Sequence, residues 1–165
     1  GPAGSGKSTI AKLIAQKLKL VFLNSGSFYR GITLSLLDNG ITISDADSVC
    51  THASSLDLGY AHERLTVNGT DVDDLLHTDR VDAQVAQVSA IPALRTIVNT
   101  KLREITKSLS IVCEGRDMTT VVFPDAEYKF YLDASLDVQA ERRFNQGVSS
   151  LSLEEIRIQS VKGMK

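Results

Sequence analysis

Apolar residues recur at helical spacing directly after a glycine-rich stretch at the start of the chain. Four of them follow one another at intervals of three or four positions: Ile10, Leu13, Ile14 and Leu18. This spacing places side chains on one face of an α-helix. The pattern therefore predicts that the loop GPAGSGKST leads into a helix with one buried stripe. The apolar run at 21–23 is too short for a helix and predicts a buried strand, after which Ser25 is expected to cap the next helix.

Helical and strand-like segments alternate along the rest of the chain. We expect helices over 26–37, 45–55 and about 79–90, and another that begins at Pro92, a residue well suited to a first helical turn. Two runs, SIVCEG (110–115) and YKFYLDA (128–134), predict strands, and final helices are expected over about 136–145 and from 153 onward. This order predicts an α/β fold with a parallel sheet flanked by helices, which binds its ligands at the carboxyl ends of its strands.

The middle of the chain has a different pattern. The segment LDLGYAHERLTVNGTDV (56–72) contains short strand-like runs, and Asn68 followed by Gly69 is a strong signal for a tight hairpin turn. A small β-sheet inserted into the α/β domain is therefore predicted. The length of 165 residues suits a single domain with such an inserted lobe.

Composition excludes several classes of protein. Apolar residues make up 42% of the chain and charged residues 23%, but no apolar run approaches the roughly 18 residues that a membrane span needs. The net charge of −2 gives no sign of a surface for polyanions, so we expect neither a membrane nor a nucleic acid as partner. Cys50 and Cys113 lack metal-ligand spacing, and we expect two reduced thiols in a cytoplasmic protein.

The glycine-rich segment fits the phosphate-binding pattern G-x-x-x-x-G-K-[ST]. Its glycines allow backbone N–H groups to surround phosphate oxygens at a helix N-terminus. Lys7 would bring a positive charge to the β- and γ-phosphates of a nucleotide, and the hydroxyl of Ser8 would bind Mg²⁺. The predicted ATP-binding residues are Gly1, Pro2, Ala3, Gly4, Ser5, Gly6, Lys7, Ser8 and Thr9. The alternative is a glycine-rich turn that only caps an amphipathic helix, but such a match arises by chance in roughly one chain of this length in two hundred.

A phosphate-binding loop does not by itself separate kinases from other nucleotide-binding proteins. A guanine-nucleotide switch would carry N-K-x-D and D-x-x-G, and neither pattern occurs in the sequence. A motor ATPase would have four apolar residues ending in Asp, whereas the best candidate strand, Ser110 to Glu114, ends in Glu. The kinase interpretation is therefore favoured.

Three motifs resemble the bacterial type of cytidylate kinase: NSGSFYR (24–30), VSAIPALR (88–95) and EGRDMTTVVFPDA (114–126). The resemblance is collinear, runs from the first residue to about Arg143, and is most specific at Gly-Arg-Asp. It implies transfer of the γ-phosphoryl group from ATP, with Mg²⁺, to CMP or dCMP. It also implies a monophosphate-binding lobe over about 38–92 and a lid over about 144–165.

The resemblance assigns roles to individual residues. Ser25, Tyr29 and Arg30 match positions that contact the monophosphate, and Arg95 and Asp117 match positions that contact cytosine. Arg116 would clamp phosphate oxygens, so the expected catalytic residues are Lys7, Arg30 and Arg116. Two structural alternatives remain open. Tyr29 and Arg30 could be a buried aromatic beside a surface arginine, and Asp117 could simply orient Arg116 through an ion pair.

The remaining polar clusters are weaker candidates. Arg142 and Arg143 are possible ATP contacts, although adjacent arginines on a helix usually form a solvated face. The acidic residues at 71, 73 and 74 lack the pattern of a calcium loop, and the three histidines lack ligand spacing. We expect no metal site from either group.

The start of the chain departs from the usual pattern, because no strand precedes the loop that begins at Gly1. We therefore expect a truncated domain, and the lid residues of the family cannot be carried over to the end of the chain. A kinase for another small metabolite and a non-catalytic nucleotide-binding module remain alternatives. We expect a monomer.

Overall fold

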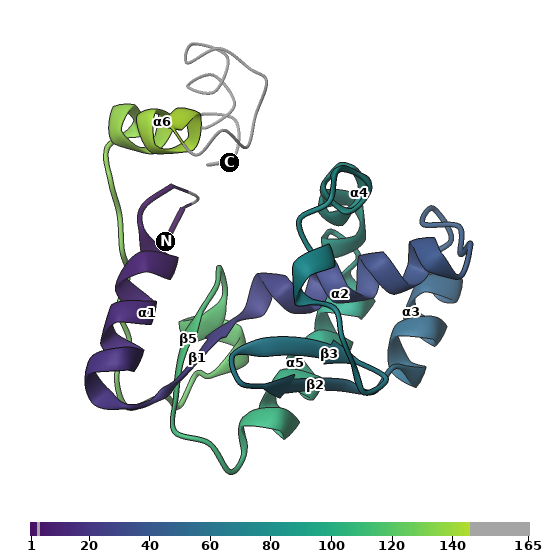
Figure 1. Cartoon of the computed structure of the whole chain (residues 1–165), viewed down its shortest axis with the longest axis horizontal. Coiled ribbons are helices and arrows are strands. Elements are labelled where there is room, and N and C mark those ends of the chain that lie inside the picture. Colours follow the sequence, from purple (N-terminus) through teal and green to yellow (C-terminus); the bar gives the residue numbers. More distant parts are fainter. Residues whose placement is uncertain (3, 146–165) are drawn as a thin grey trace.

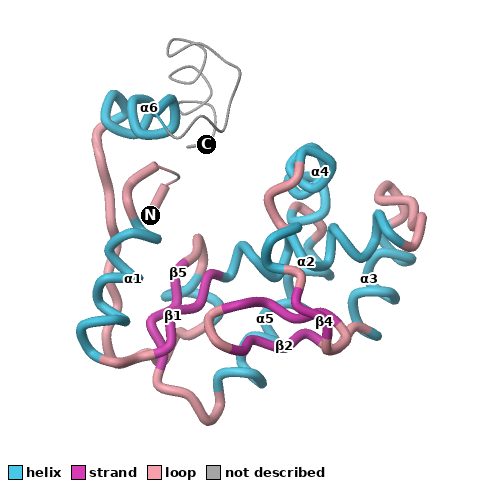
Figure 2. The backbone as a smooth tube through the Cα atoms, viewed as in Figure 1, coloured by secondary structure: helices cyan, strands magenta, loops and turns pink. Residues whose placement is uncertain are grey.

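The fold is α/β, as the order of segments predicts, and contains two small sheets (Figures 1 and 2). The computed structural model describes residues 1–2 and 4–145. The helices are α1 (Lys7–Leu18), α2 (Ser25–Asp38), α3 (Ala46–Ser55), α4 (Asp79–Ser89), α5 (Pro92–Thr106) and α6 (Leu136–Asn145), with short helical turns at η1 (Asp73–Leu75) and η2 (Met118–Val122). The strands are β1 (Val21–Asn24), β2 (Leu58–Ala61), β3 (Arg64–Val67), β4 (Thr70–Asp71) and β5 (Ile111–Glu114).

The first sheet joins two segments that lie far apart in the sequence. β1 pairs with β5 in parallel, in a register that places Val21 opposite Ile111 and Asn24 opposite Glu114. Both strands therefore end at the same edge of the sheet, and the residues that follow them, Ser25 and Gly115, begin next to each other. This is the edge where parallel sheets bind ligands.

The second sheet is the predicted insertion. β2, β3 and β4 form an antiparallel meander, and the turn between β3 and β4 is made by Asn68 and Gly69, both with positive φ. This confirms the predicted hairpin. The turn between β2 and β3 also has positive φ at His62 and Glu63, and it lacks the Asn-Gly or Asp-Gly pair that would have predicted it.

Helix α2 is the centre of the core, and it packs against α4, α5 and β3. Its inward face is completely buried at Phe28, Ile32 and Leu36. Gly31 allows the inserted sheet to approach this helix, because a Cβ there would lie 2.5 Å from Cδ2 of Leu65 on β3. The inserted sheet is thus fixed to the same helix that begins at the ligand-binding edge.

The predicted buried stripe on α1 is wrong. Leu13 and Leu18 are 57% and 61% exposed, and Ile10 and Ile14 are also exposed. The residues that α1 buries are Ala11 and Ala15, which pack near Phe22 of β1. The small alanine face lets the helix lie close to β1 and β5, while the larger apolar side chains stay partly or largely exposed.

The predicted strand at 128–134 is also wrong. This segment has no regular structure, and Phe130 is 72% exposed between two exposed tyrosines. A strand needs a neighbour to satisfy its backbone groups, and among the described residues β5 pairs only with β1. Between β5 and the 128–132 segment lies a cavity of about 920 Å³ that Ile14 of α1 also lines.

Several other expectations can be compared with the structure. Helices α3, α4, α5 and α6 confirm the predicted ones within a few residues, including Pro92 in the first turn of α5. Ser25 is not the cap of α2, because Asn24 takes that position and its side chain accepts from the backbone N–H of Gly26. The helix from 153 onward and nearly all of the predicted lid lie outside the described residues. No described helix is long and apolar enough to cross a membrane.

We predict that adding an extended apolar segment ahead of Gly1 will stabilise the domain. Such a segment would fill the cavity, pair with the second edge of β5 and cover Ile14 and Phe130. The free energy of unfolding should rise by on the order of 2 kcal/mol or more, which is the effect of burying one large apolar side chain. Urea unfolding of the chain with and without the segment measures the change. Equal stability, and equal activity, would contradict the expectation of a missing strand.

Candidate active site

The glycine-rich loop has the backbone of an anion-binding turn. Gly4 and Gly6 have φ of 77° and 93°, a region that favours glycine. Ser5 is buried, and its hydroxyl donates to the carbonyl of Pro2 at 2.9 Å, which closes the loop. Gly6 precedes α1, and within the described part of the chain no side chain caps the first N–H groups of this helix. These donors therefore face the position where a phosphate would bind.

Lys7 lies at the mouth of this loop. Its ammonium group donates to the carbonyl of Pro2 at 2.6 Å, and the side chain is half-buried. Desolvation lowers the pKa of Lys7, the nearby charge of Arg116 lowers it further, and Glu114 opposes both effects. Lys7, Glu114 and Arg116 line the same cavity, so the end of β5 faces the phosphate loop.

Ser8 connects the loop to the sheet. Its hydroxyl donates to Oε1 of Glu114 at 2.7 Å, so the start of α1 meets the end of β5. Hydroxyl and carboxylate oxygens are the ligands that Mg²⁺ prefers, and these two groups fit the cation. Glu114 was not among the predicted site residues, because it was considered as the end of a motor-type strand and as the first residue of a family motif but was given no role. The available signal was an acidic residue at a strand end, directly before Gly-Arg-Asp.

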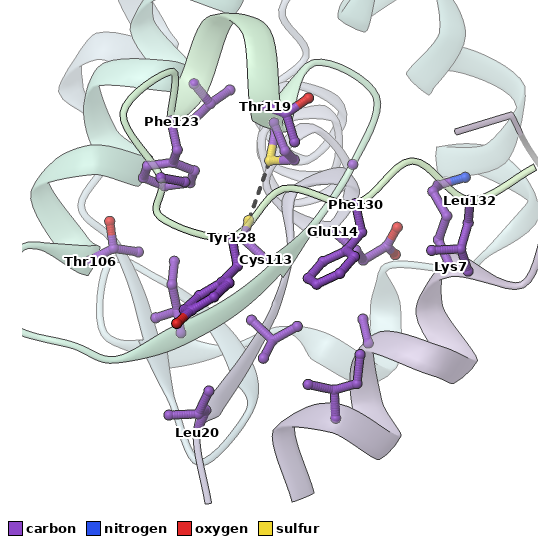
Figure 3. Close-up of a pocket in the computed structure, with 18 of the residues that line it drawn as sticks. Lys7, Leu20, Thr106, Cys113, Glu114, Thr119, Phe123, Tyr128, Phe130 and Leu132 are labelled. Carbon is purple, nitrogen blue, oxygen red and sulfur yellow. Dashed lines mark hydrogen bonds between the residues drawn. The ribbon is translucent and has the colours of Figure 1, made fainter. Parts of the chain in front are cut away.

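The large cavity carries Lys7 and Glu114 at the end next to the phosphate loop. Figure 3 shows Lys7 and Glu114 toward one end, with Phe123 and Thr106 toward the other. Most of the wall between them comes from apolar side chains such as Val112 and Phe130. A triphosphate therefore fits the end near Lys7, whereas the apolar part of the cavity lies along the edge of β5 that no described strand pairs with.

Gly115 allows the two strand ends to approach each other closely. A Cβ at this position would lie 2.1 Å from Oγ of Ser25 and about 3 Å from the side chain of Met118. Ser25 is buried, so it has little room to move away. Only glycine can therefore place Ser25 beside the segment that carries Arg116 and Asp117.

Arg95 and Asp117 are brought together, as the resemblance implies. They form an ion pair with each other, and Arg95 also donates to the carbonyl of Ser89 at 3.3 Å. The alternative in which Asp117 pairs with Arg116 is not what the structure has. Arg116 is exposed, and no hydrogen bond or ion pair joins it to the rest of the described chain. Its guanidinium is accessible to a phosphate.

Tyr29 and Arg30 project from the first turns of α2. Burial raises the pKa of Tyr29, against a smaller opposing effect of Arg95, so its phenol stays protonated near neutral pH. Nη1 of Arg30 donates to the carbonyl of Leu76 at 2.9 Å and pairs with Asp82 of α4. Arg30 is thus not an isolated surface arginine, and its contacts join α2 to the helix after the inserted sheet.

Helix α6 also reaches the phosphate loop. Nη1 of Arg142 lies 3.4 Å from the carbonyl of Gly4, and a Cβ on Gly6 would lie 3.2 Å from the same nitrogen. This position agrees with the expectation that Arg142 is a possible ATP contact. The side chain of Arg143, the residue Ala3 and all but the first two residues of the predicted lid lie outside the described part of the chain.

The weaker candidates have structural partners. Arg64 pairs with Asp71 and, at 2.8 Å, with Asp74, while Asp73 accepts from the backbone N–H of Leu65. These contacts hold the inserted sheet together. Nε2 of His52 lies 2.8 Å from Oγ of Ser35, and both cysteines are free thiols.

Comparison with known proteins supports the resemblance. A family model described as cytidylate kinase matches residues 1–162. The chain belongs to the cytidylate kinase family. It is 38% identical over 146 residues to a cytidylate kinase of Clostridium botulinum (strain Loch Maree / Type A3), covering 88% of this chain and 67% of that protein. It is 39% identical to a cytidylate kinase of Caldanaerobacter subterraneus subsp. tengcongensis, covering 88% and 65%. The aligned part thus spans about two thirds of the length of these relatives.

We predict that Gly115→Ala will destabilise this cytidylate kinase family member by about 1–3 kcal/mol, because the new methyl group would overlap Oγ of Ser25. Urea unfolding measures the loss. The double variant Ser25→Ala/Gly115→Ala removes the oxygen that the methyl group meets, so part of the stability should return. An equal loss in both backgrounds would show that the approach of Ser25 is not the cause.

Proposed function

We propose that this chain transfers the γ-phosphoryl group of ATP to CMP or dCMP. The observation that supports this most strongly is the convergence of Lys7, Ser8, Glu114 and Arg116 at the end of the phosphate loop. Membership of the cytidylate kinase family names the reaction class. Because the chain spans about two thirds of its relatives, the activity of the whole protein is part of this proposal.

The proposed mechanism depends on positioning and charge rather than on a covalent intermediate. The phosphate of CMP already carries anionic oxygens near neutral pH, so it can act as the nucleophile without a side-chain base. Lys7 and Arg116 would neutralise charge on the transferring group, and Arg30 would orient the acceptor phosphate. Arg142 could complete this arrangement from α6.

Mg²⁺ would be held by Ser8 and Glu114. Their oxygens already lie together at 2.7 Å, beside the lysine that is expected to bind the same phosphates. The cation would supply charge neutralisation between the β- and γ-phosphates. The task left to the chain is to keep Ser8 and Glu114 in place beside Lys7.

For recognition of the base, we propose Arg95 and Asp117, with Ser25, Tyr29 and Arg30 on the monophosphate. The exocyclic amino group of cytosine donates to a carboxylate, while its ring nitrogen and O2 accept from a guanidinium. Uracil would place a carbonyl against Asp117 and leave buried acceptors unpaired. The ion pair of Arg95 with Asp117 supports this role, because it keeps the donor and acceptor groups side by side.

Two other functions remain candidates for the same loop. A non-catalytic nucleotide-binding module would bind ATP without releasing ADP, and a kinase for another metabolite would prefer a different acceptor. A coupled assay for ADP release over a panel of nucleoside monophosphates separates all three. That the protein acts as a monomer in the cytoplasm stays a prediction.

Lys7→Met should reduce phosphoryl transfer by ~10³-fold or more, because the β- and γ-phosphates lose their cation. The fold should remain nearly intact, since Lys7 lies at the loop edge and its stem can stay in place. The matched control is Lys17→Met, an exposed lysine on the same helix. ADP release and thermal unfolding are measured on both variants. Wild-type turnover in Lys7→Met would exclude the phosphate-loop mechanism.

Asp117→Asn should reduce the preference for CMP over UMP by at least about tenfold in kcat/KM, because the amide can donate as well as accept. The amide oxygen can still accept from Arg95, so the ion-pair partner keeps a hydrogen bond. Steady-state kinetics with both nucleotides give the ratio. If both substrates are slowed equally and the preference is unchanged, Asp117 only positions Arg95, and base recognition lies elsewhere.

A further inference from the structure

The turn that follows Arg116 and Asp117 has an unusual geometry. Residues Met118–Val122 (η2) form a π-type turn, in which the N–H of Val122 donates to the carbonyl of Asp117 at 3.1 Å and the N–H of Phe123 to that of Met118 at 2.8 Å. Turns of this kind are rare and are frequently found at functional sites. A helical turn that ends after one repeat leaves its last carbonyls without backbone partners.

Arg103 satisfies two of these carbonyls. Its Nε donates to the carbonyl of Val122 at 2.8 Å, and its Nη2 donates to that of Val121 at 2.5 Å. A guanidinium is planar and presents its donors at fixed angles. Two hydrogen bonds to successive carbonyls therefore set the orientation of the turn relative to α5 as well as the distance between them. The positive charge also lies at the negative end of the turn.

The helix that carries Arg103 holds the other end of the same turn. Arg95 lies eight residues earlier on α5, about 12 Å along the helix, and pairs with Asp117 directly before the turn. Between the two arginines, Val98 and Leu102 are completely buried, so α5 cannot shift easily. Through Arg95 and Arg103, the same rigid helix therefore contacts the segment 117–122 at both of its ends.

We propose that Arg103 is a positioning residue that sets the orientation of Asp117 and thereby the selectivity for the base. This rests on the proposed function, in which Asp117 contacts cytosine. Arg103 acts only through the backbone of the turn. Among the described residues, its hydrogen bonds go to Val122 and Val121 and none goes to the phosphate loop, so we expect ATP affinity to change little when Arg103 is replaced.

The test compares Arg103→Met and Arg103→Lys with the wild-type chain. Methionine keeps the apolar stem and removes every hydrogen-bond donor. Lysine keeps the positive charge but lacks the planar guanidinium that can donate to two carbonyls at fixed angles. The matched control is Lys101→Met, because Lys101 on the same helix also donates to two carbonyls, those of Ser54 at 3.3 Å and Leu56 at 2.7 Å, on a different part of the fold. Titration calorimetry with CMP, UMP and ATP gives affinities, and hydrogen exchange reports on the amides of Val122 and Phe123.

In Arg103→Met, the ratio of CMP to UMP affinity should fall by about threefold or more, a change typical of a remote positioning contact, and the two amides should exchange faster. Arg103→Lys should recover part of both effects. ATP affinity should stay within about twofold, and Lys101→Met should keep the wild-type ratio even if it lowers stability. A loss of stability alone would move none of the ratios.

Two results would overturn the proposal, and they can be distinguished. If the wild-type chain selects CMP and Arg103→Met keeps the same ratio, Arg103 has only a structural role and the proposed function stands. If the wild-type chain binds ATP but does not distinguish CMP from UMP, the proposed recognition of cytosine fails, and the role of Arg103 fails with it.

Discussion

The parallel pairing of β1 with β5 is the interaction on which the candidate site depends. Asn24 and Glu114 are ninety positions apart in the sequence, and the register places them opposite each other. The residues that follow each strand therefore start from the same edge of the sheet. On one side α2 begins with Ser25, and on the other the chain turns through Gly115 to Arg116. Without that register, Glu114 would not meet Ser8, and the phosphate loop would face no carboxylate.

Several cations of the site are held by oxygen atoms of the protein before any substrate is bound. Lys7 contacts the carbonyl of Pro2, Arg30 contacts Leu76 and Asp82, and Arg95 contacts Ser89 and Asp117. These partners lower the cost of gathering positive charges in one region, and they limit the side-chain entropy that binding would remove. Arg116 is different, since it is exposed and makes no such contact with the described chain. Substrate binding must order this side chain, whereas the others only exchange partners.

Much of the fold could be predicted from the sequence wherever local signals agreed with tertiary contacts. Three elements combine an apolar pattern with a residue that marks where the element begins or ends, and each is confirmed. They are the helix at Pro92, the hairpin at Asn68 and the strand before Gly115. The strand at 128–134 and the buried stripe on α1 failed for one reason, because both patterns require a neighbour that the described chain does not supply. In the site, the glycine-rich motif identified Lys7 and Ser8. Glu114 could be recognised only from the structure, in which β5 pairs with β1 and its end meets Ser8. The partner of Arg103 could not be read from the sequence at all, because it is a pair of backbone carbonyls.

The open edge of β5 also affects how this chain behaves at high concentration. Among the described residues only β1 pairs with β5, and the other edge of β5 lies beside the largely exposed Tyr128, Phe130 and Tyr131 and beside Leu18 of α1. An exposed strand edge next to apolar side chains is a template for edge-to-edge association between molecules. The net charge of −2 provides little electrostatic repulsion against it. The colloidal stability of this polypeptide therefore depends on the surface at which the described residues leave the sheet two strands wide, and it should improve with whatever closes that edge.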